Sequence, residues 1–384
     1  MVGKTIYVPK ETAFAESRVA ASPDTVKKLK ALGFDIVIEA GAGLASRIDD
    51  DAFRAAGAEI AGVEAASSAD IIFAVRRPEE DSFAAYKSGA VVVALMDPYD
   101  NEAALAAMGE KGLSAFAMEL MPRITRAQSM DVLSSQANLA GYQAVIEAAA
   151  VFDRAMPMMM TAAGTVPAAR VFVMGAGVAG LQAIATARRL GAAVSATDVR
   201  PAAKEQVASL GAKFIAVEDD EFKAAETAGG YAKEMSAEYQ AKQAELIASH
   251  IAKQDIVITT ALIPGRPAPR LVTRDMLASM KLGSVVVDLA VERGGNVEGA
   301  EPGSVVTVAG VSVIGYQNLP GRIAASASLL YAKNLLTFFE TLVDKETGEL
   351  KINRDDELVA ATLLTHDGAV VHPKFGGETA EGEA

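Results

Sequence analysis

The chain has 384 residues, of which 51% are hydrophobic and 22% are charged, a composition typical of globular proteins and unlike that of disordered chains. At roughly 100 to 200 residues per domain, this length predicts two domains. The formal net charge of −13 opposes the phosphate backbone of nucleic acids and anionic membrane surfaces, so we expect neither as a direct partner. The sequence contains no cysteine, which excludes disulfides, thiolate nucleophiles and cysteine–metal sites.

The first third of the chain alternates short apolar runs with helical patterns, which is typical of parallel βαβ units. It begins directly with a strand-like run and shows no apolar leader segment, so we expect a cytoplasmic protein. Ser22 followed by Pro23 predicts a helix start, and Gly33 predicts the end of that helix. The strand-like runs are 5–8, 34–41, 70–75, 90–96 and 114–118, and the helical patterns are 22–33, 50–58 and 101–112.

A polar loop at 121–131 and a long helical pattern at 133–152 separate this region from a second α/β unit. The apolar stretch 156–187 is broken by prolines, glycines and Arg170, so we do not expect it to enter a membrane. Strand-like runs at 170–177, 192–198, 213–217, 255–262, 284–290 and 311–316 alternate with helical patterns at 178–191, 201–211 and 273–280, around a charged, helix-prone insertion at 218–253.

A last helix is predicted at 323–343, and an Asp-Gly pair predicts that 357–373 forms a hairpin. The terminal residues 376–384 are predicted to fray. We therefore expect an α/β protein with two Rossmann-like, doubly wound parallel-sheet domains and a cleft between them. The expected domains are 1–132 together with 330–384, and 133–329.

A dinucleotide-binding fingerprint follows the strand-like run at 170–174. Gly175 permits a tight turn, Gly177 lets the backbone approach a pyrophosphate, and Gly180 lets the helix pack closely on the strand. The helix amino end that follows favours phosphate. Asp198 is the acidic residue expected about 20 positions later, where it accepts from a ribose 2′-OH and favours NAD over NADP. Arg200 keeps the NADP alternative open, and glycines used only for close packing remain the structural alternative.

A conventional dehydrogenase adds a general acid or base, most often a histidine. The three histidines lack metal-ligand spacing and lie in a helical pattern (His250) or beside the tail turn (His366 and His372), where structural roles are expected. Direct hydride transfer between two nicotinamides needs apposition and orientation but no acid or base. The scarcity of candidate acids and bases is consistent with that chemistry, although lysine, tyrosine or a carboxylate could substitute for a histidine.

Four runs of the sequence resemble the NAD(H)-binding domain I of the proton-translocating NAD(P) transhydrogenases, and the resemblance extends from 9 to 372, over nearly the whole chain. These runs are 118–150, 157–214, 225–235 and 258–269. The resemblance implies NAD(H) bound by this chain, NADP(H) bound by a partner subunit, and direct hydride transfer of the Si-Re (AB) type that occurs only with the partners. The length resembles that of the bacterial form in which this domain is a separate subunit.

The resemblance also implies partners and roles for individual residues. It implies a homodimer that associates with membrane-embedded transhydrogenase subunits, including the NADP(H)-binding one, and so lies at the cytoplasmic face of the inner membrane. Arg123, Gln128 and Asp131 would orient the nicotinamide, with Ser134 on its amide, whereas a solvated loop with a helix cap is the structural alternative. The other cofactor-binding positions implied are Val178, Asp198, Arg200, Gln243 and Leu262.

The insertion 218–253 is long for a connection between a strand and a helix. Its segment 229–235 resembles the family's mobile loop, which implies that Gly230, Tyr231 and Met235 help to close over the nucleotide. An amphipathic surface helix with a glycine break is the alternative.

Two other functions remain open. Residues 9–11 and Arg18 also resemble alanine dehydrogenase, but Arg76 stands where that enzyme has a lysine, and Met96 where it has a histidine. The amino acid site is therefore expected to be dismantled, and Arg18 to form a salt bridge at the domain interface. The third alternative, a non-catalytic NAD-sensing module, would not need the loop 121–131.

Overall fold

The computed structural model describes residues 4–223, 235–344 and 347–376, and the chain folds as two compact units. Unit 1 comprises 1–136 and 321–384, and unit 2 comprises 137–320. The sequence placed these divisions after 132 and after 329. Helix α5 (Val132–Val151) crosses the first division. None of the helices among the described residues is long and apolar enough to cross a membrane.

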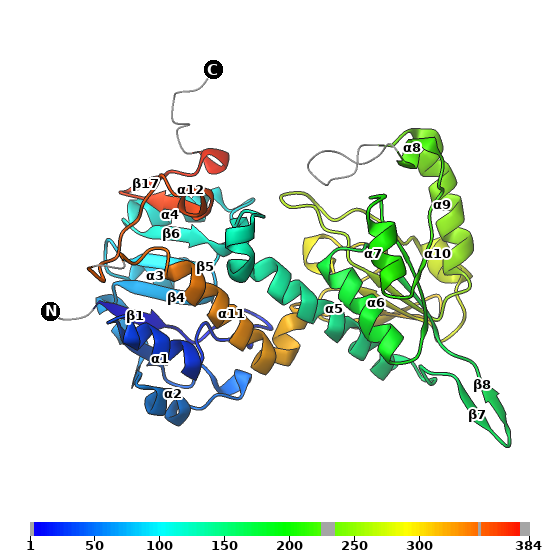
Figure 1. The fold of residues 1–384 in the computed structure, drawn as a ribbon, viewed down its shortest axis with the longest axis horizontal. Coiled ribbons are helices and arrows are strands. Elements are labelled where there is room, and N and C mark those ends of the chain that lie inside the picture. The colour runs from blue at the N-terminus through cyan, green and yellow to red at the C-terminus, as the bar shows by residue number, and fades with distance from the viewer. Residues whose placement is uncertain (1–3, 224–234, 345–346, 377–384) are drawn as a thin grey trace. The chain divides into compact units, whose positions relative to one another are not determined.

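Unit 1 is built on an eight-stranded sheet in the order β17-β16-β6-β5-β4-β1-β2-β3 (Figure 1). The strands from β1 to β6 are parallel, and their order is the doubly wound 3-2-1-4-5-6. The antiparallel pair β16–β17 extends the sheet beside β6. The strands are β1 (Thr5–Val8), β2 (Asp35–Glu39), β3 (Glu59–Ala61), β4 (Ile71–Arg76), β5 (Val91–Leu95), β6 (Ser114–Ala117), β16 (Leu363–His366) and β17 (Ala369–Val370).

Both faces of this sheet are buried, as its parallel strands require. Ile71, Phe73 and Val75 of β4 belong to one hydrophobic cluster, which α1 and α11 cover, while Ile72 and Ala74 belong to the other, which α3 and α4 cover. Successive side chains of a strand point to opposite faces, so the continuous apolar runs of the sequence fill both layers. The helices are α1 (Pro23–Ala31), α2 (Asp50–Ala56), α3 (Glu80–Ala84), α4 (Glu102–Glu110), α11 (Ala324–Phe339) and α12 (Glu357–Thr362).

The ends of these elements follow local chemistry. Ser22 caps α1 in a capping box with Thr25, and Gly33 follows that helix with φ +92°. The Asp-Gly turn predicted in the tail joins β16 to β17, with φ 47° at Asp367 and 86° at Gly368. The first part of the predicted hairpin is instead helix α12, because Asp356 accepts from the Leu358 amide and starts a helix there.

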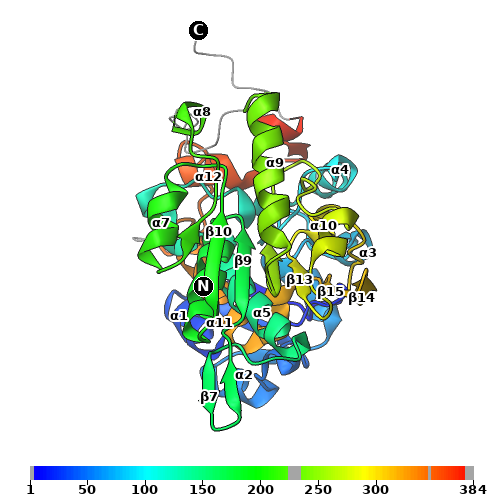
Figure 2. The same ribbon diagram turned by 90° about the vertical axis from the view of Figure 1, so that its right-hand side faces the viewer.

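Unit 2 contains a seven-stranded sheet in the order β11-β10-β9-β12-β13-β15-β14, which Figure 2 shows with α9 in front of it. All its strands are parallel except β14, which pairs antiparallel with β15. The two parallel sheets confirm the expected α/β class. The strands are β9 (Arg170–Met174), β10 (Ala193–Thr197), β11 (Lys213–Phe214), β12 (Ile256–Thr259), β13 (Val285–Asp288), β14 (Val305–Val308) and β15 (Val311–Ile314).

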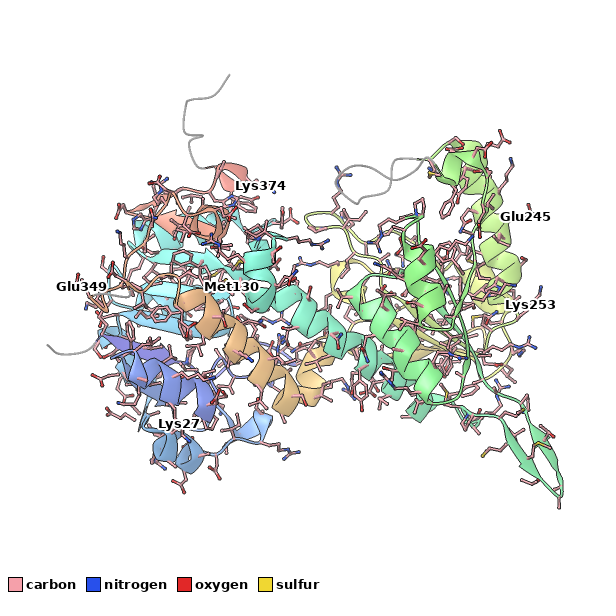
Figure 3. The ribbon with its side chains drawn as sticks, viewed as in Figure 1. Lys27, Met130, Glu245, Lys253, Glu349 and Lys374 are labelled. Atoms are coloured by element: carbon pink, nitrogen blue, oxygen red, sulfur yellow. The ribbon has the colours of Figure 1, made fainter. Side chains whose placement is uncertain are left out.

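Helices cover both faces of this sheet as well. One hydrophobic cluster joins the sheet to α5, α6 and α7, and the other joins it to α9 and α10. Charged side chains on the outer surface, such as Glu245 of α9 and Lys253 just after it, are exposed (Figure 3). The helices are α6 (Val178–Arg189), α7 (Ala203–Ser209), α8 (Asp220–Lys223), α9 (Ala237–Ile251) and α10 (Arg274–Ser279).

A separate two-stranded hairpin, β7 (Met159–Thr161) with β8 (Gly164–Val166), lies between α5 and β9. Its residues are exposed, including Met160 at 79%. This hairpin was not predicted, because its residues lie in an apolar stretch interrupted by prolines and glycines.

Candidate functional site

The site of unit 2 lies where its strand order reverses. Strand β9 has β10 on one side and β12 on the other, and the chain leaves β9 and β12 at the same edge of the sheet. In open α/β sheets, ligands bind at the carboxyl ends of the strands at such a switch point. The fingerprint loop follows β9, and Thr260 follows β12.

Glycine is needed at the three fingerprint positions for different physical reasons. Gly175 has φ +105°, and a Cβ there would lie 2.4 Å from Thr260 Oγ1. A Cβ on Gly180 would lie 1.8 Å from the Gly175 carbonyl oxygen. A Cβ on Gly177, by contrast, would have no atom within 4 Å other than those of Gly177 itself and its two chain neighbours. Packing therefore requires Gly175 and Gly180, while Gly177 leaves open space in which a ligand can approach the backbone.

Helix α6 begins directly at this open space. Gly177 is its N-cap residue and supplies no side-chain cap, so the first amide groups of α6 are not capped by the residue before them. Arg188 and Arg189 in its last turn complement the helix dipole at the other end. Uncapped amides and the positive end of the dipole favour a phosphate group.

The Asp198 carboxylate lies beside the fingerprint loop. It accepts from the Ala176 amide at 2.7 Å and from the Arg200 amide at 2.9 Å. The Arg200 guanidinium also donates to both of its oxygens, at 2.8 and 3.0 Å, and to the Ala176 carbonyl at 3.2 Å. Four donors occupy the carboxylate, whose side chain is only 7% exposed. A ribose hydroxyl must therefore share this carboxylate with Arg200 or displace it.

Apolar side chains surround the loops at this edge. Val178 and Leu262, which the resemblance implied, are 41% and 52% exposed. Val199 and Ile263, which were not predicted, are 65% and 46% exposed. Val199 and Ile263 lie in the loops after β10 and β12, and an apolar residue in the loop after a parallel strand is the signal that could have found them. Exposed apolar groups at this edge suit the flat faces of a nucleotide.

Gln243 reaches the same edge from α9. Its amide oxygen accepts from the Val217 amide at 2.9 Å, and its amide nitrogen donates to Thr197 Oγ1 at 3.3 Å. Thr197 is the residue before Asp198, so Gln243 positions the end of β10. Tyr239, which was not predicted, donates to the Val217 carbonyl at 3.1 Å.

Of the three residues that the resemblance implies close over the nucleotide, one lies within the described residues of the chain. Met235 accepts a hydrogen bond from the Gln240 side chain at 2.9 Å, whereas Gly230 and Tyr231 fall outside the described residues. On either side of that gap, Glu221 accepts from the Ser236 amide at 2.5 Å and from its hydroxyl at 2.6 Å.

The predicted nicotinamide loop belongs to unit 1, where η3 (Met118–Leu120) and η4 (Thr125–Met130) precede α5. Arg123 and Gln128 are exposed. Asp131 accepts from the Ser134 amide at 2.9 Å and from its hydroxyl at 2.5 Å, which caps α5. Asp131 and Ser134 thus form the helix cap that was considered as the structural alternative. Arg123 and Gln128 take no part in this cap and lie at the surface.

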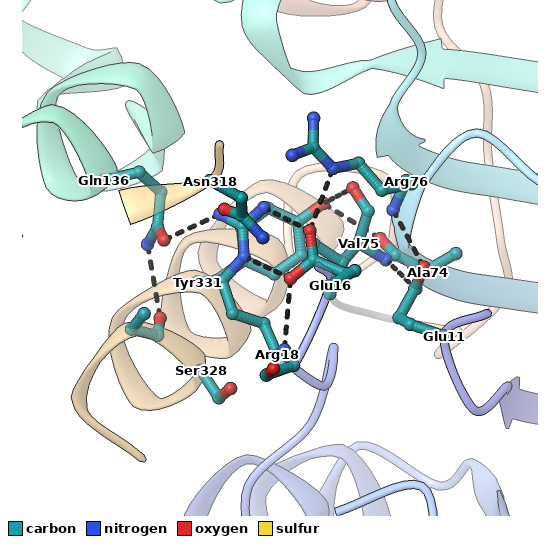
Figure 4. Close-up of polar contacts among 12 residues, drawn as sticks. Glu11, Glu16, Arg18, Ala74, Val75, Arg76, Gln136, Asn318, Ser328 and Tyr331 are labelled. Carbon is teal, nitrogen blue, oxygen red and sulfur yellow. Dashed lines mark hydrogen bonds and ion pairs between the residues drawn. The ribbon is translucent and has the colours of Figure 1, made fainter. Parts of the chain in front are cut away.

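Unit 1 carries a second charged cluster at its own switch point, between β1 and β4 (Figure 4). Arg18 donates to both oxygens of Glu16, at 2.6 and 2.7 Å, and to Gln136 at 2.9 Å. Arg76 donates to Glu16 at 2.8 Å. Burial alone would raise the pKa of Glu16, but the hydrogen bonds and charge of Arg18, with the charge of Arg76, lower the pKa to about 2. The ion pair predicted for Arg18 thus has its partner within unit 1.

This cluster bears on the alanine dehydrogenase alternative. Met96 is fully buried, and Arg76 is paired with Glu16. Glu11 accepts from the Val75 amide at 2.5 Å, and burial raises the pKa of this carboxyl to about 7. The adjacent cavity, of about 50 Å³, is lined by residues of the loops after β1 and β4, among them Lys10 and Arg77. A lysine and a histidine that could handle an amino acid are not found at positions 76 and 96.

The histidines have structural partners. His250 is hydrogen-bonded to Ser195 Oγ at 2.8 Å, and burial lowers its pKa. His366 is hydrogen-bonded to Ser114 Oγ at 2.9 Å, and the buried His372 accepts from the Lys374 amide at 3.2 Å. Within the described ranges there is no group of His, Asp or Glu side chains arranged to hold a metal ion.

Comparison with known proteins shows what this chain is similar to. Residues 7–140 match the alanine dehydrogenase/PNT N-terminal domain, and residues 144–373 match the C-terminal domain of the same family. An NAD(P) transhydrogenase alpha subunit of Rhodospirillum rubrum is 56% identical over 98% of this chain and 100% of its own length. The crystal structure of transhydrogenase from Sinorhizobium meliloti is 68% identical, has a TM-score of 0.89, and is matched over 96% of this chain and 100% of its own.

Alanine dehydrogenase is a more distant relative. The enzyme of Halomonas elongata is 29% identical over 96% of this chain and 94% of its own length. These identities confirm the resemblance drawn from the sequence. The chain belongs to the alanine dehydrogenase/PNT family, among relatives named as transhydrogenase alpha subunits.

Proposed function

We propose that this chain is the NAD(H)-binding subunit of a proton-translocating NAD(P) transhydrogenase and passes hydride directly to or from NADP(H) on a partner subunit. The observation that carries the proposal is the edge of unit 2, where Gly177 leaves open space in front of an uncapped helix and Asp198 lies beside the same loop. The names of the transhydrogenase relatives support the choice of reaction.

The residues at this edge fit a dinucleotide. The backbone of 175–180 and the amino end of α6 would hold the pyrophosphate. Asp198 would accept from the ribose, while its pairing with Arg200 keeps that guanidinium from a 2′-phosphate. Val178 and Leu262 would flank the adenosine side, and the end of β10 would be held in place by Gln243.

The nicotinamide end is assigned to the loop of unit 1. Bound NAD(H) supplies or accepts a hydride at its nicotinamide ring, and this chemistry needs no acid or base from the protein. Arg123 and Gln128, both exposed, would orient the ring and contact the partner's nucleotide. Asp131 and Ser134 would hold the start of α5 in the correct pose. Gly230, Tyr231 and Met235 would close over the site.

The partners are included in the proposal. The chain would form a homodimer and bind, at the cytoplasmic face of the membrane, to the subunits that translocate protons and hold NADP(H). Sedimentation of the purified chain should give twice its monomer mass, and a monomer at micromolar concentration would contradict the homodimer.

A hydride-transfer assay tests the function. The purified chain with NADH is given either pyruvate plus ammonia, or an NADP-binding partner subunit with an NADP analogue whose reduction has its own absorbance band. Turnover only with the partner supports the proposal. Turnover with pyruvate and ammonia would favour an alanine dehydrogenase, and NADH binding without turnover in either mixture would favour an NAD-sensing module.

Gln128→Ala tests the loop within the same assay. We expect hydride transfer with the partner to fall by roughly tenfold to a hundredfold, because orientation at the reacting centre is lost. NADH binding should change less. Arg126→Ala is the matched control, since Arg126 is an exposed residue of the same loop whose partner is Asp356, at 2.8 Å. Equal transfer rates for Gln128→Ala and the wild type would remove Gln128 from the mechanism.

A further inference from the structure

One buried amide holds both ends of an exposed arch at the proposed nucleotide site. The arch, 262–267, follows β12 and is exposed along its length. Asn296, which is fully buried, donates to the Ala261 carbonyl at 2.9 Å and to the Pro269 carbonyl at 2.8 Å. Its side-chain oxygen accepts from the Ala261 amide at 3.1 Å. The amide nitrogen and the amide oxygen of the Asn296 side chain thus both bind the backbone at the ends of the arch.

The backbone of Asn296 adds to this clamp. Its carbonyl accepts from the amides of Leu271 and Val272, at 2.8 and 3.0 Å. The Ala268 amide donates to the Arg293 carbonyl at 2.8 Å, so the segment after β13 holds the returning end of the arch along several residues.

Asp288, at the end of β13, fixes the segment that carries Asn296. One carboxylate oxygen accepts from the Ala290 amide at 2.8 Å, and the other accepts from the Val297 amide at 2.9 Å. Gly295 has φ +77°, and a Cβ there would lie 2.7 Å from the Asp288 carboxylate. The turn that presents the Asn296 side chain therefore depends on a buried carboxylate and a glycine.

The arch is tied to the fingerprint loop as well. Thr260, just before Ala261, donates to the Gly175 carbonyl at 3.1 Å. The arch itself contains Pro264 and Pro267, which restrict its backbone, and it exposes Leu262 and Ile263. Because the segment is stiff and held at both ends, these two side chains keep a fixed position. A fixed position lowers the entropy that a binding site loses when a ligand binds.

We propose that Asn296 is a positioning residue for NAD(H): it sets the arch 262–267 against the nucleotide without touching the nucleotide itself. This inference rests on the proposed function, because it assumes that NAD(H) binds at the carboxyl edge of β9 and β12. Removing the Asn296 side-chain amide removes its three hydrogen bonds to the Ala261 and Pro269 backbone groups. The arch is then free to adopt several conformations, and ordering it when NAD(H) binds makes the binding free energy less favourable.

The test compares Asn296→Ala with a matched control at the opposite edge of the same sheet. Gln254 is also a buried amide, 4% exposed, but it precedes β12 and donates to the His250 carbonyl at 2.9 Å. Hydrogen exchange of the purified full chain should show faster exchange at the Ala261 amide, which donates to the Asn296 side chain, in Asn296→Ala and not in Gln254→Ala. The dissociation constant for NADH should rise roughly tenfold in Asn296→Ala and stay within about twofold in Gln254→Ala.

The possible outcomes separate the positioning role from the proposed function. If wild-type protein does not bind NADH, the proposed function fails, whatever the exchange result. If the wild type binds NADH but Asn296→Ala binds it equally well, or if both variants lose affinity in proportion to their loss of thermal stability, the positioning role is overturned. If Asn296→Ala does not fold, Asn296→Ser, which keeps one donor and one acceptor, is measured against the same control, with the same criteria.

Discussion

The two units share the strand order 3-2-1-4-5 around their switch points, but the residues at the two switch points differ. In unit 2, the loop after β9 carries Gly177, which leaves open space in front of α6. In unit 1, the loop after β1 carries Glu11, whose carboxylate accepts hydrogen bonds from the backbone at the end of β4. The cavity there has about 50 Å³, against roughly 300 to 1,000 Å³ for typical ligand pockets.

Topology gives both units the same edge for a binding site, whereas the side chains determine whether that edge is open. The doubly wound order brings two loops to one edge in both units. Gly177 keeps that edge open in unit 2, whereas ion pairs among Glu16, Arg18 and Arg76 fill it in unit 1. The pyrophosphate and adenosine end of a nucleotide is therefore expected at the switch point of unit 2 and not at that of unit 1. The following changes test this difference.

The largest effect is expected at Gly180. Gly180→Val places side-chain atoms against the Gly175 carbonyl, so we expect the free energy of unfolding to fall by about 3 kcal/mol and NADH binding to be lost. Gly177→Ala is the matched change, since its Cβ meets nothing within 4 Å. It should keep thermal stability but weaken NADH binding. Equal behaviour of the two variants in denaturation and NADH titration would show that these glycines do not divide into packing and ligand roles.

Glu11 tests the closed switch point of unit 1. Its pKa in the folded chain is about 7, raised by burial from an ordinary 4.5, so folding favours the protonated form. This contribution to stability is fully present below about pH 4.5 and is lost as the pH rises through 7. Between pH 5 and 8 the wild type should lose about 2 kcal/mol more unfolding free energy than Glu11→Gln, as measured by urea denaturation.

Glu79 supplies the control for that experiment. It lines the same small cavity but is exposed, so Glu79→Gln should keep the pH dependence of the wild type. If the unfolding free energy of Glu11→Gln keeps the full pH dependence of the wild type, Glu11 is not held in its protonated form at this switch point.

Asp198 tests the choice of nucleotide in unit 2. Asp198→Ala removes both the ribose acceptor and a negative charge that would repel a 2′-phosphate, so NADH binding should weaken by about tenfold while NADPH binding weakens less or improves. Arg200→Ala leaves the carboxylate in place and should retain the preference for NADH. Titration of both nucleotides against each variant measures the ratio. A ratio unchanged in Asp198→Ala would refute the assignment of this carboxylate to the ribose.

The smallest effect is expected at Asp131, where a cap and a catalytic role can be separated. Asp131→Ala should cost about 1 kcal/mol of unfolding free energy, because α5 loses its N-cap. Asp131→Ser restores a capping oxygen and should restore thermal stability. If hydride transfer with the partner recovers in Asp131→Ser along with stability, Asp131 acts only as a cap; if it does not, the carboxylate itself serves the nicotinamide end.

Local signals in the sequence predicted much of this fold. The apolar runs of β1, β4, β5, β9 and β12 are continuous because both faces of each sheet are covered, and that pattern is visible without a structure. The cap at Ser22 and the turn at Asp367 are set by neighbouring residues. The fingerprint from Gly175 to Gly180 is likewise local, because strand, turn and helix follow one another in the chain.

The features that were missed depend on residues far apart in the sequence. Asn296 is distant from Ala261 in the chain, and nothing around it distinguishes it from a loop asparagine. The short edge strands β3 and β14 and the exposed hairpin β7–β8 lack the buried apolar runs that mark a central strand. The helix at 357–362 was predicted as strand, because its apolar residues fit either period over so short a length.

The most direct measurement is hydrogen exchange of the full chain with and without saturating NADH, followed peptide by peptide. We predict protection in unit 2 at 175–182, 198–200 and 260–272, and no change in unit 1 at 9–13 or 74–79. Protection confined to the unit 1 segments, with the fingerprint loop unchanged, would place the nucleotide at the other switch point and contradict the division of roles between the two units.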